Sequence, residues 1–247
     1  MKIALIETGR PPEPIASRFG HYPQMMADYF APIVAGAEFH TCSLIGGNRL
    51  PRFEETDAII IMGSPHSVYD DLPWIEPLMA FIREAARKQI PQIGICFGHQ
   101  IIAKAMGGKV DKAPNGWGIG RHTYKAAPNV GGINFGSELN LLVSHQDQVL
   151  IKPDCAQVLA RSDFTPNAAL YYPHANAISF QAHPEFKPEF LRELIISRRG
   201  TRFSVEEADA ALASIKEPID GGTVAREIFA LLGRARANQN RNKAMAA

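Results

Sequence analysis

Short apolar runs alternate with amphipathic stretches along the first part of the chain. The runs at Ile3–Ile6, 57–63 (DAIIIMG) and 92–96 (QIGIC) are rich in β-branched residues, which is typical of strands buried on both faces of a sheet. Helices are indicated at 22–36 (YPQMMADYFAPIVAG) and after Pro77, where apolar residues recur at i, i+3, i+4, i+7 and i+8. This alternation predicts an α/β fold with a mostly parallel open sheet and helices on both faces.

The middle of the chain has a different pattern. From about residue 118 to 180, short apolar runs are separated by turns that contain Asn, Pro, Gly and Asp. The runs are 139–144, 156–162, 167–173 and 177–183. They predict a small antiparallel region, either at the sheet edge or as a separate layer.

The C-terminal part is predicted to be helical. Residues 1–199 are expected to form one α/β domain that ends in a helix. Beyond it, Ser204 with Glu207 three residues later has the pattern of a helix N-terminus, and a second amphipathic stretch follows a glycine pair. We expect residues 200–247 to form a helical extension packed on the domain. Its last segment, Asn238–Ala247, is polar and basic and is predicted to fray.

The composition of the chain is that of a globular protein. The chain has 247 residues, is 46% hydrophobic and carries a formal net charge of +1. It is long enough to bury a sizeable core, and its balanced charge gives no reason to expect nucleic acid or an anionic membrane as a partner. The first apolar run is too short for a signal peptide or a membrane span. We therefore expect a cytoplasmic protein.

One of the three cysteines lies in a distinctive turn. Cys42, Cys96 and Cys155 are too widely spaced for a disulfide framework or a CxxC zinc site, and Cys42 and Cys155 are expected to be buried. Gly94, Cys96 and Gly98 form GxCxG between a strand and a helix, the thiol counterpart of the GxSxG nucleophile elbow. The helix N-terminus favours a thiolate. A free cysteine is more often a small core residue, so this turn needs catalytic partners elsewhere in the chain.

A catalytic cysteine needs a base and a group that stabilises an oxyanion, and the chain offers a candidate for each. His183 and Glu185 lie two residues apart at the end of an apolar strand, so both side chains can enter one cleft, with Glu185 orienting the imidazole. The backbone N–H groups of Gly63 and Ser64, in a turn that ends the neighbouring strand, can face an oxyanion together with that of Phe97. Each feature alone is more typical of a solvated loop or an ordinary turn at the end of a strand. Their combination with the cysteine turn indicates a nucleophilic site.

The combined motifs resemble the class I (triad) glutamine amidotransferase family. The resemblance rests on GICFGHQ at 94–100 and the later HPE at 183–185, and it covers roughly residues 1–195. The segments MGSPHSVYDDLPWI and SHQDQV are most similar to the stand-alone, GMP-synthase-like branch. The resemblance implies a flavodoxin-like sheet. It also implies attack by a cysteine on the side-chain amide of glutamine, giving a γ-glutamyl thioester, ammonia and then glutamate.

The resemblance also assigns roles to residues. It implies Cys96 as nucleophile, His183 as base and acid, and Glu185 as the partner of His183. It implies further residues that hold the amino-acid end of glutamine, namely Gln100, Ser144, His145, Gln146 and Asp147. Many members have Gly-Gly-Pro at the oxyanion loop, whereas this chain has Gly63-Ser64-Pro65, which keeps a backbone donor with less conformational freedom.

No cofactor and no metal are expected. The glycine-rich segments 116–120 and 131–136 lack the spacing of a phosphate-binding loop in a strand–turn–helix setting and are predicted to be loops. The eight histidines have no metal-ligand spacing. Trp74 and Trp117 are predicted to be packing residues.

Three functions remain open at this point. The first is an amidotransferase that supplies ammonia to a separate synthetase chain or hydrolyses glutamine by itself. The second is a hydrolase or peptidase that acts on other γ-glutamyl amides by the same chemistry. The third is a non-catalytic binding or regulatory module, against which the complete set of Cys96, His183 and Glu185 argues. The oligomeric state is open as well, a homo-oligomer included.

Overall fold

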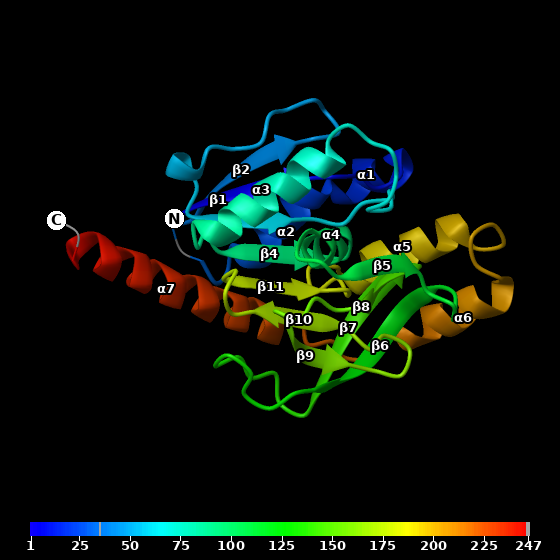
Figure 1. The fold of residues 1–247 in the computed structure, drawn as a ribbon. Helices are drawn as coiled ribbons and strands as arrows, with labels where there is room; N and C mark the ends of the chain where they lie inside the picture. Colours follow the sequence, from blue (N-terminus) through cyan, green and yellow to red (C-terminus); the bar gives the residue numbers. More distant parts are fainter. Residues whose placement is uncertain (35, 246–247) are drawn as a thin grey trace.

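A nine-stranded sheet forms the centre of the molecule in the computed structural model, which describes residues 1–34 and 36–245 and side chains up to Ala235 (Figure 1). In spatial order, its strands are β2 (Glu38–Ser43), β1 (Lys2–Glu7), β3 (Ala58–Ile61), β4 (Gln92–Ile95), β11 (Ala177–Phe180), β10 (Ala169–Tyr172), β9 (Gln157–Arg161), β6 (Gly118–Ala126) and β7 (Glu138–His145). The strands from β2 to β11 are parallel, and those from β10 to β7 pair antiparallel. A separate two-stranded sheet pairs β5 (Lys109–Lys112) with β8 (Asp147–Ile151).

Helices cover both faces of the large sheet (Figure 1). Successive strand residues point to opposite faces, so Ile3 and Leu5 of β1 join one core cluster and Ala4 and Ile6 join the other. The first cluster includes residues of α2 (Tyr22–Phe30) and α7 (Gly221–Met245), and the second includes residues of α3 (Ile75–Arg87) and α4 (Phe97–Ala105). The mostly parallel α/β fold predicted from the sequence is therefore confirmed.

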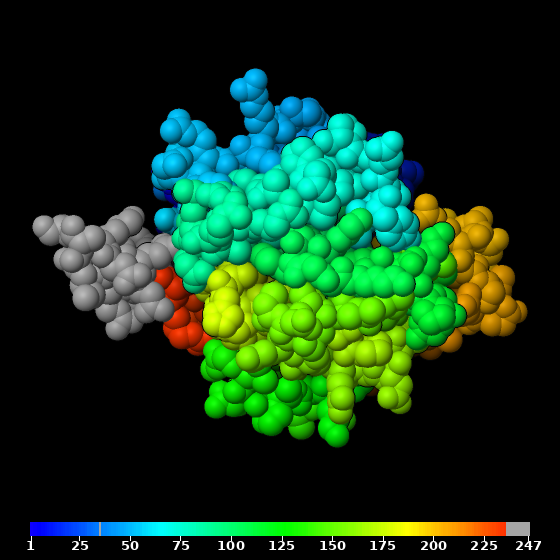
Figure 2. All heavy atoms as spheres, in the orientation of Figure 1, coloured from blue at the N-terminus to red at the C-terminus, as the bar shows by residue number. Residues whose placement is uncertain are grey.

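A third cluster packs three further helices together at the end of the sheet where the parallel strands finish. It joins α1 (Glu13–Phe19), α5 (Pro188–Arg198) and α6 (Val205–Ser214). In the space-filling view, α5 and α6 form one end of the molecule (Figure 2). Helix α6 begins with the predicted capping box of Ser204 and Glu207 and packs on β6. A short 3₁₀ helix at Phe53–Glu55 precedes β3.

Two expectations need correction. Cys42 is buried, but Cys155 is exposed because it lies in the turn between β8 and β9, at the surface where turns normally run. The glycine-rich segment 116–120 is only partly a loop, since β6 starts at Gly118; a Cβ atom on Gly120 would lie 2.5 Å from Ser214 Oγ, so glycine there permits α6 to approach the strand.

The C-terminal tail continues helix α7, and its fraying stays a prediction. The backbone is helical through Met245, which includes most of the segment expected to fray, and the last two residues lie outside the described part of the chain. The boundary between two parts at residue 199 stays a prediction. None of the helices in the described ranges combines the length and apolar character of a membrane span.

Candidate active site

Cys96 occupies a strained turn between β4 and α4. Its backbone has φ 52° and ψ −102°, a region that residues with a side chain rarely adopt. The flanking glycines make the turn possible, because a Cβ atom on Gly98 would lie 2.0 Å from the carbonyl oxygen of Ile61 and one on Gly94 would lie 2.5 Å from that of Gly98. The backbone N–H of Cys96 donates to the carbonyl of Phe180 in the neighbouring strand β11 at 2.8 Å. The thiol therefore lies at the carboxyl end of the sheet and at the N-terminus of α4.

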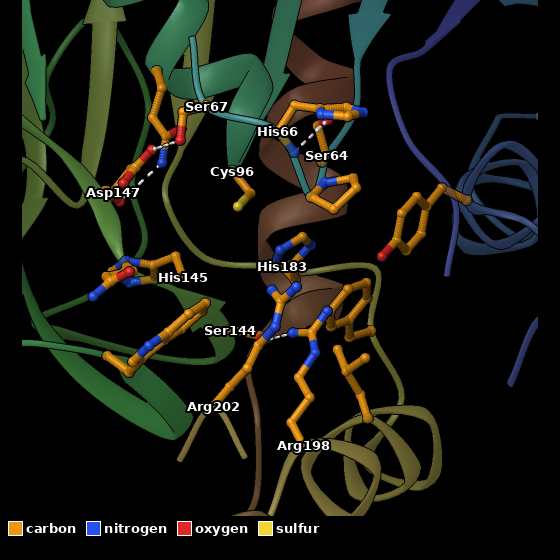
Figure 3. A pocket seen from close by; sticks show the side chains of 18 of the residues that line it. Ser64, His66, Ser67, Cys96, Ser144, His145, Asp147, His183, Arg198 and Arg202 are labelled. Atoms are coloured by element: carbon orange, nitrogen blue, oxygen red, sulfur yellow. Dashed lines mark hydrogen bonds between the residues drawn. The ribbon is translucent and has the colours of Figure 1, made fainter. Parts of the chain in front are cut away.

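His183 is held on several sides just beyond β11. Its Nδ1 lies 2.8 Å from Oε1 of Glu185, and both side chains are buried. Its ring stacks on Phe186 with centroids 3.8 Å apart and planes 8° apart. Its backbone N–H donates to the carbonyl of Leu142 in β7 at 2.8 Å. These contacts leave Nε2 of the ring for the pocket, where Cys96 faces it (Figure 3).

The charges around His183 favour its protonated form. Burial lowers the pKa of His183. The charges of Glu185 and Cys96, and hydrogen bonds to both, raise it by more than burial lowers it, so that the pKa is about 10. An ordinary histidine has a pKa of about 6.5. At neutral pH the imidazole is thus a cation that stabilises negative charge on the neighbouring sulfur, as does the N-terminus of α4.

The loop after β3 presents free backbone donors beside the thiol. Ser64 Oγ donates to the carbonyl of Thr8 at 2.6 Å and accepts from the N–H of His66 at 3.1 Å, which fixes the loop. Neither Gly63 nor Ser64 has a positive φ, so a serine here needs no strained backbone. Among the described residues, no acceptor takes the N–H of Ser64 or of Phe97. Two unpaired donors that flank a nucleophile are what an oxyanion site requires.

Gln181 links the thiol of Cys96 to Gln100 by hydrogen bonds. Its Nε2 donates to Cys96 Sγ at 3.7 Å, and its Oε1 accepts from Nε2 of Gln100 at 3.2 Å. Gln100 also donates to the backbone carbonyl of Asp147 at 2.9 Å. The amide protons of Gln100, expected to bind substrate, are thus used within the protein. Sequence reasoning missed Gln181, although its position two residues before His183 places it on the same side of the strand.

Asp147 ties the oxyanion loop to the opposite wall. Its carboxylate accepts hydrogen bonds from Ser67 Oγ at 2.6 Å and from the hydroxyl of Tyr69 at 3.0 Å. Both donors follow Ser64 in the loop after β3. The carboxylate expected to bind substrate therefore holds two parts of the site together.

A pocket of about 230 Å³ unites most of the predicted residues (Figure 3). The predicted residues that line it are Gly63, Ser64, Cys96, Gln100, Ser144, His145, Gln146, Asp147 and His183. Glu185 lies behind His183, and the side chain of Phe97 packs on Trp74 in the core. Trp117 packs as predicted, on Phe203, but it also lines the pocket.

Other residues that line the pocket were not predicted from the sequence. Tyr22, Lys112, Arg198 and Arg202 come from elements far apart in the chain, and no local motif marks them. His145 is buried, and burial lowers its pKa to about 3, so it is neutral at physiological pH. Among the described residues, no group of His, Cys, Asp and Glu side chains could hold a metal ion.

Comparison with known proteins adds an independent finding. The family model for glutamine amidotransferase class-I matches residues 36–200. A glutamine amidotransferase-like protein of Schizosaccharomyces pombe is 30% identical over 93% of this chain and 98% of its own length. Gamma-glutamyl peptidase 2 of Arabidopsis thaliana is 30% identical over 78% of this chain and 83% of its own. The crystal structure of a glutamine amidotransferase from Thermotoga maritima superposes with a TM-score of 0.75 at 21% identity, covering 94% of this chain and 98% of that one.

Proposed function

The chain belongs to the class I glutamine amidotransferase family, and on that basis we propose that it hydrolyses the side-chain amide of glutamine through a thioester on Cys96. The observation that carries the proposal is the position of Cys96, in a strained elbow, opposite a cationic His183 held by Glu185. Unpaired N–H groups of Ser64 and Phe97 flank the same thiol. These parts provide nucleophile, acid–base group and oxyanion donors.

The first half of the reaction forms the thioester. The sulfur of Cys96 attacks the δ-carbon of the substrate amide, and the carbonyl oxygen takes the negative charge and accepts hydrogen bonds from Ser64 and Phe97. His183 gives its proton to the amide nitrogen, the carbon–nitrogen bond breaks, and ammonia leaves. The γ-glutamyl group is then bonded to sulfur.

The second half consumes water. His183, now neutral, removes a proton from a water molecule that attacks the thioester carbon, and the carbon–sulfur bond breaks. Glutamate leaves, and the thiolate and imidazolium are restored. Glu185 accepts from Nδ1 of the ring, so that the transferred proton leaves from Nε2 in the first half and is taken up there in the second. The γ-glutamyl group is transferred to water, and the ammonia is released to solvent or passed to a separate synthetase chain.

The second candidate is hydrolysis of other γ-glutamyl amides. The same steps cleave a γ-glutamyl peptide when an amino acid or peptide amine leaves in place of ammonia. The relative named a gamma-glutamyl peptidase supports this candidate. The two candidates share the acyl group and differ in the leaving group.

The test combines turnover with covalent labelling. The purified chain is incubated with glutamine and with a γ-glutamyl dipeptide, and the released ammonia or amino acid is measured. A glutamine-like chloroketone is expected to alkylate Cys96, and Cys96→Ser is expected to lose the label and the activity while keeping its circular dichroism spectrum. Exposed Cys155 provides the control, since Cys155→Ser should keep both. Labelling at Cys42 or Cys155 without loss at Cys96→Ser would refute the assignment.

A further inference from the structure

Two arginines lie together in the wall of the pocket. Arg198 ends α5 and Arg202 lies in the turn that follows, and both line the pocket that holds Cys96 (Figure 3). The backbone N–H of Arg202 donates to the carbonyl of Arg198 at 2.9 Å. Phe203, the next residue, is buried against Trp117 with ring centroids 5.2 Å apart. The turn is therefore anchored, and the two guanidinium groups are held on the same side of the pocket.

Neither guanidinium is neutralised by the part of the chain whose side chains are described. Arg198 donates from Nη1 to Ser144 Oγ at 3.1 Å, an uncharged partner. Two nearby arginines do form ion pairs. Arg192 pairs with Glu193 at 2.9 Å, and Arg199 pairs with Asp209 at 2.8 Å. Among the side chains that the structure describes, none forms such an ion pair with Arg198 or Arg202.

This arrangement costs free energy in the empty pocket. Burial lowers the pKa of half-buried Arg198, and the charge of Arg202 lowers it further. Arg202 itself is exposed, but two like charges that lie side by side, one of them half-buried, are stabilised when an anion binds between them. Arginine is also suited to this task, because its planar group donates two parallel hydrogen bonds to a carboxylate.

The pocket has more positive than negative side chains, which favours a ligand with a net negative charge. Asp147 is the one carboxylate among the residues that line it, and Ser67 and Tyr69 donate to it. Besides cationic His183, whose charge faces that of the sulfur of Cys96, Lys112 adds a third cation to the two arginines. Glutamine has one carboxylate and one ammonium group, so it adds no net charge. A γ-glutamyl amide of an amino acid has a second carboxylate and a net negative charge.

We propose that Arg198 and Arg202 form a carboxylate subsite that makes γ-glutamyl amino acids or peptides, with a free carboxylate beyond the cleaved amide, better substrates than glutamine. The inference rests on the proposed thiol chemistry and specifies its substrate class. A γ-glutamyl peptide has two carboxylates that the arginines can bind: the one on the leaving group, which we propose, and the α-carboxylate of the γ-glutamyl unit.

The experiment compares three substrates that separate these two carboxylates. Glutamine has only the α-carboxylate, γ-glutamylalanine has both, and γ-glutamylalanine amide has lost the carboxylate of the leaving group. In the unmodified protein, γ-glutamylalanine is expected to have the lowest KM. Arg198→Gln and Arg202→Gln are each expected to raise that KM about tenfold, the scale of a lost charge-assisted hydrogen bond, with little change in kcat. The KM values of glutamine and of the dipeptide amide should stay nearly unchanged.

Matched variants separate recognition from folding. Arg192→Gln removes an arginine from the same helix outside the pocket and should leave all kinetic constants unchanged. Arg198→Lys keeps the charge without the two-pronged geometry and should lose less than Arg198→Gln. Ser144→Ala removes the internal partner of Arg198 but keeps both charges, so its KM for γ-glutamylalanine should change less than in either Gln variant. Equal thermal stability of these proteins would exclude misfolding as the cause.

Other outcomes overturn the inference in distinguishable ways. An equal rise in KM for all three substrates would assign the arginines to the α-carboxylate and refute the preference for peptides. Unchanged KM values would refute the subsite. A calorimetric titration of Cys96→Ser with γ-glutamylalanine measures binding without turnover. Binding that depends on Arg198, in a chain whose unmodified form hydrolyses no substrate, would keep the subsite and refute the proposed function.

Discussion

Gly63 lies so close to His183 that a Cβ atom at residue 63 would be 2.9 Å from Cε1 of the imidazole. The ring has no room to yield, because Glu185 holds its Nδ1 and Phe186 stacks on its face. Gly63→Ala is therefore expected to displace the base and to lower kcat about a hundredfold, the cost of a shift of about 1 Å in a reacting group.

Gly233→Ala is the control for that substitution. Nothing lies within 4 Å of a Cβ atom at Gly233, which is in α7. This variant should keep full activity and gain about 0.5–1 kcal/mol of unfolding free energy from the alanine. Steady-state kinetics and thermal denaturation of both proteins measure the effects. An active Gly63→Ala protein would show that the ring can move.

His183 and Glu185 are expected to contribute unequally. His183→Ala should lower kcat nearly as much as Cys96→Ser, since the nucleophile and its base act as a unit. Glu185→Gln keeps the shape and one hydrogen bond to Nδ1, so its loss should be smaller. Release of product from glutamine and from a γ-glutamyl dipeptide measures both. Equal activity of the unmodified protein and His183→Ala would mean that the histidine belongs to an inert loop.

The pH dependence should show an alkaline limit set by His183. Its pKa in the folded protein is about 10, above its ordinary value of about 6.5. Because the proton is needed for the leaving nitrogen, kcat should fall as the pH rises through about 10. The stability that the charged ring contributes is complete below about pH 6.5 and is lost as the pH rises through the same limit.

Glu185→Gln is the informative comparison for this profile. Removing the carboxylate removes the main charge that raises the pKa, so the alkaline limit should move to lower pH. Rate profiles of the two proteins between pH 6 and about 11 would show the shift. The same alkaline limit in both would mean that another group controls it.

Asp147 is expected to act by positioning the oxyanion loop. Asp147→Ala removes the acceptor of Ser67 and Tyr69, which should loosen the loop that carries Ser64 and lower kcat about tenfold, as expected for two lost hydrogen bonds. Tyr69→Phe removes only the exposed bond and should have a smaller effect. A change in KM alone, with unchanged kcat, would instead assign Asp147 to substrate binding.

The helices after residue 199 are expected to be needed for a stable monomer. A chain that ends at Arg199 lacks α6 and α7, and the sheet then loses the buried apolar cover of Val224, Ile228 and Leu231. We expect aggregation or a changed oligomeric state, measured by light scattering after gel filtration. Removal of Asn238–Ala247 alone should have no effect. An active protein of unchanged assembly state after truncation at Arg199 would show that both helices are dispensable.

Much of the parallel half of the sheet could be predicted, because strands buried on both faces have a strong apolar pattern. The predicted runs around Ile3, Ile60 and Ile93 became β1, β3 and β4. The edge strand Glu38–Ser43 was missed, since most of its side chains are exposed or only half-buried. Lys109–Lys112 was missed for the same reason, with one buried residue among its four. Strands with few buried positions have no periodic signal.

The residues that meet around Cys96 were more predictable than the walls of the pocket. Cys96, His183 and Glu185 lie in short motifs whose residue types and spacing indicate their roles. Arg198 and Arg202 enter the same pocket only because α5 and the turn after it pack beside β7, a contact between segments distant in sequence. Long-range packing of this kind leaves no local pattern in the chain.

The pairing of β4 with β11 also determines when the parts of the proposed site come together during biosynthesis. Residues 97–176 are synthesised between the two strands, yet Ile95 and Phe180 end side by side. Closing so long a loop is slow and is favourable only once the strands can dock. A nascent chain therefore exposes the cysteine of the elbow without its base. Until the central pair forms, Cys96 lies apart from His183, and the proposed site is incomplete.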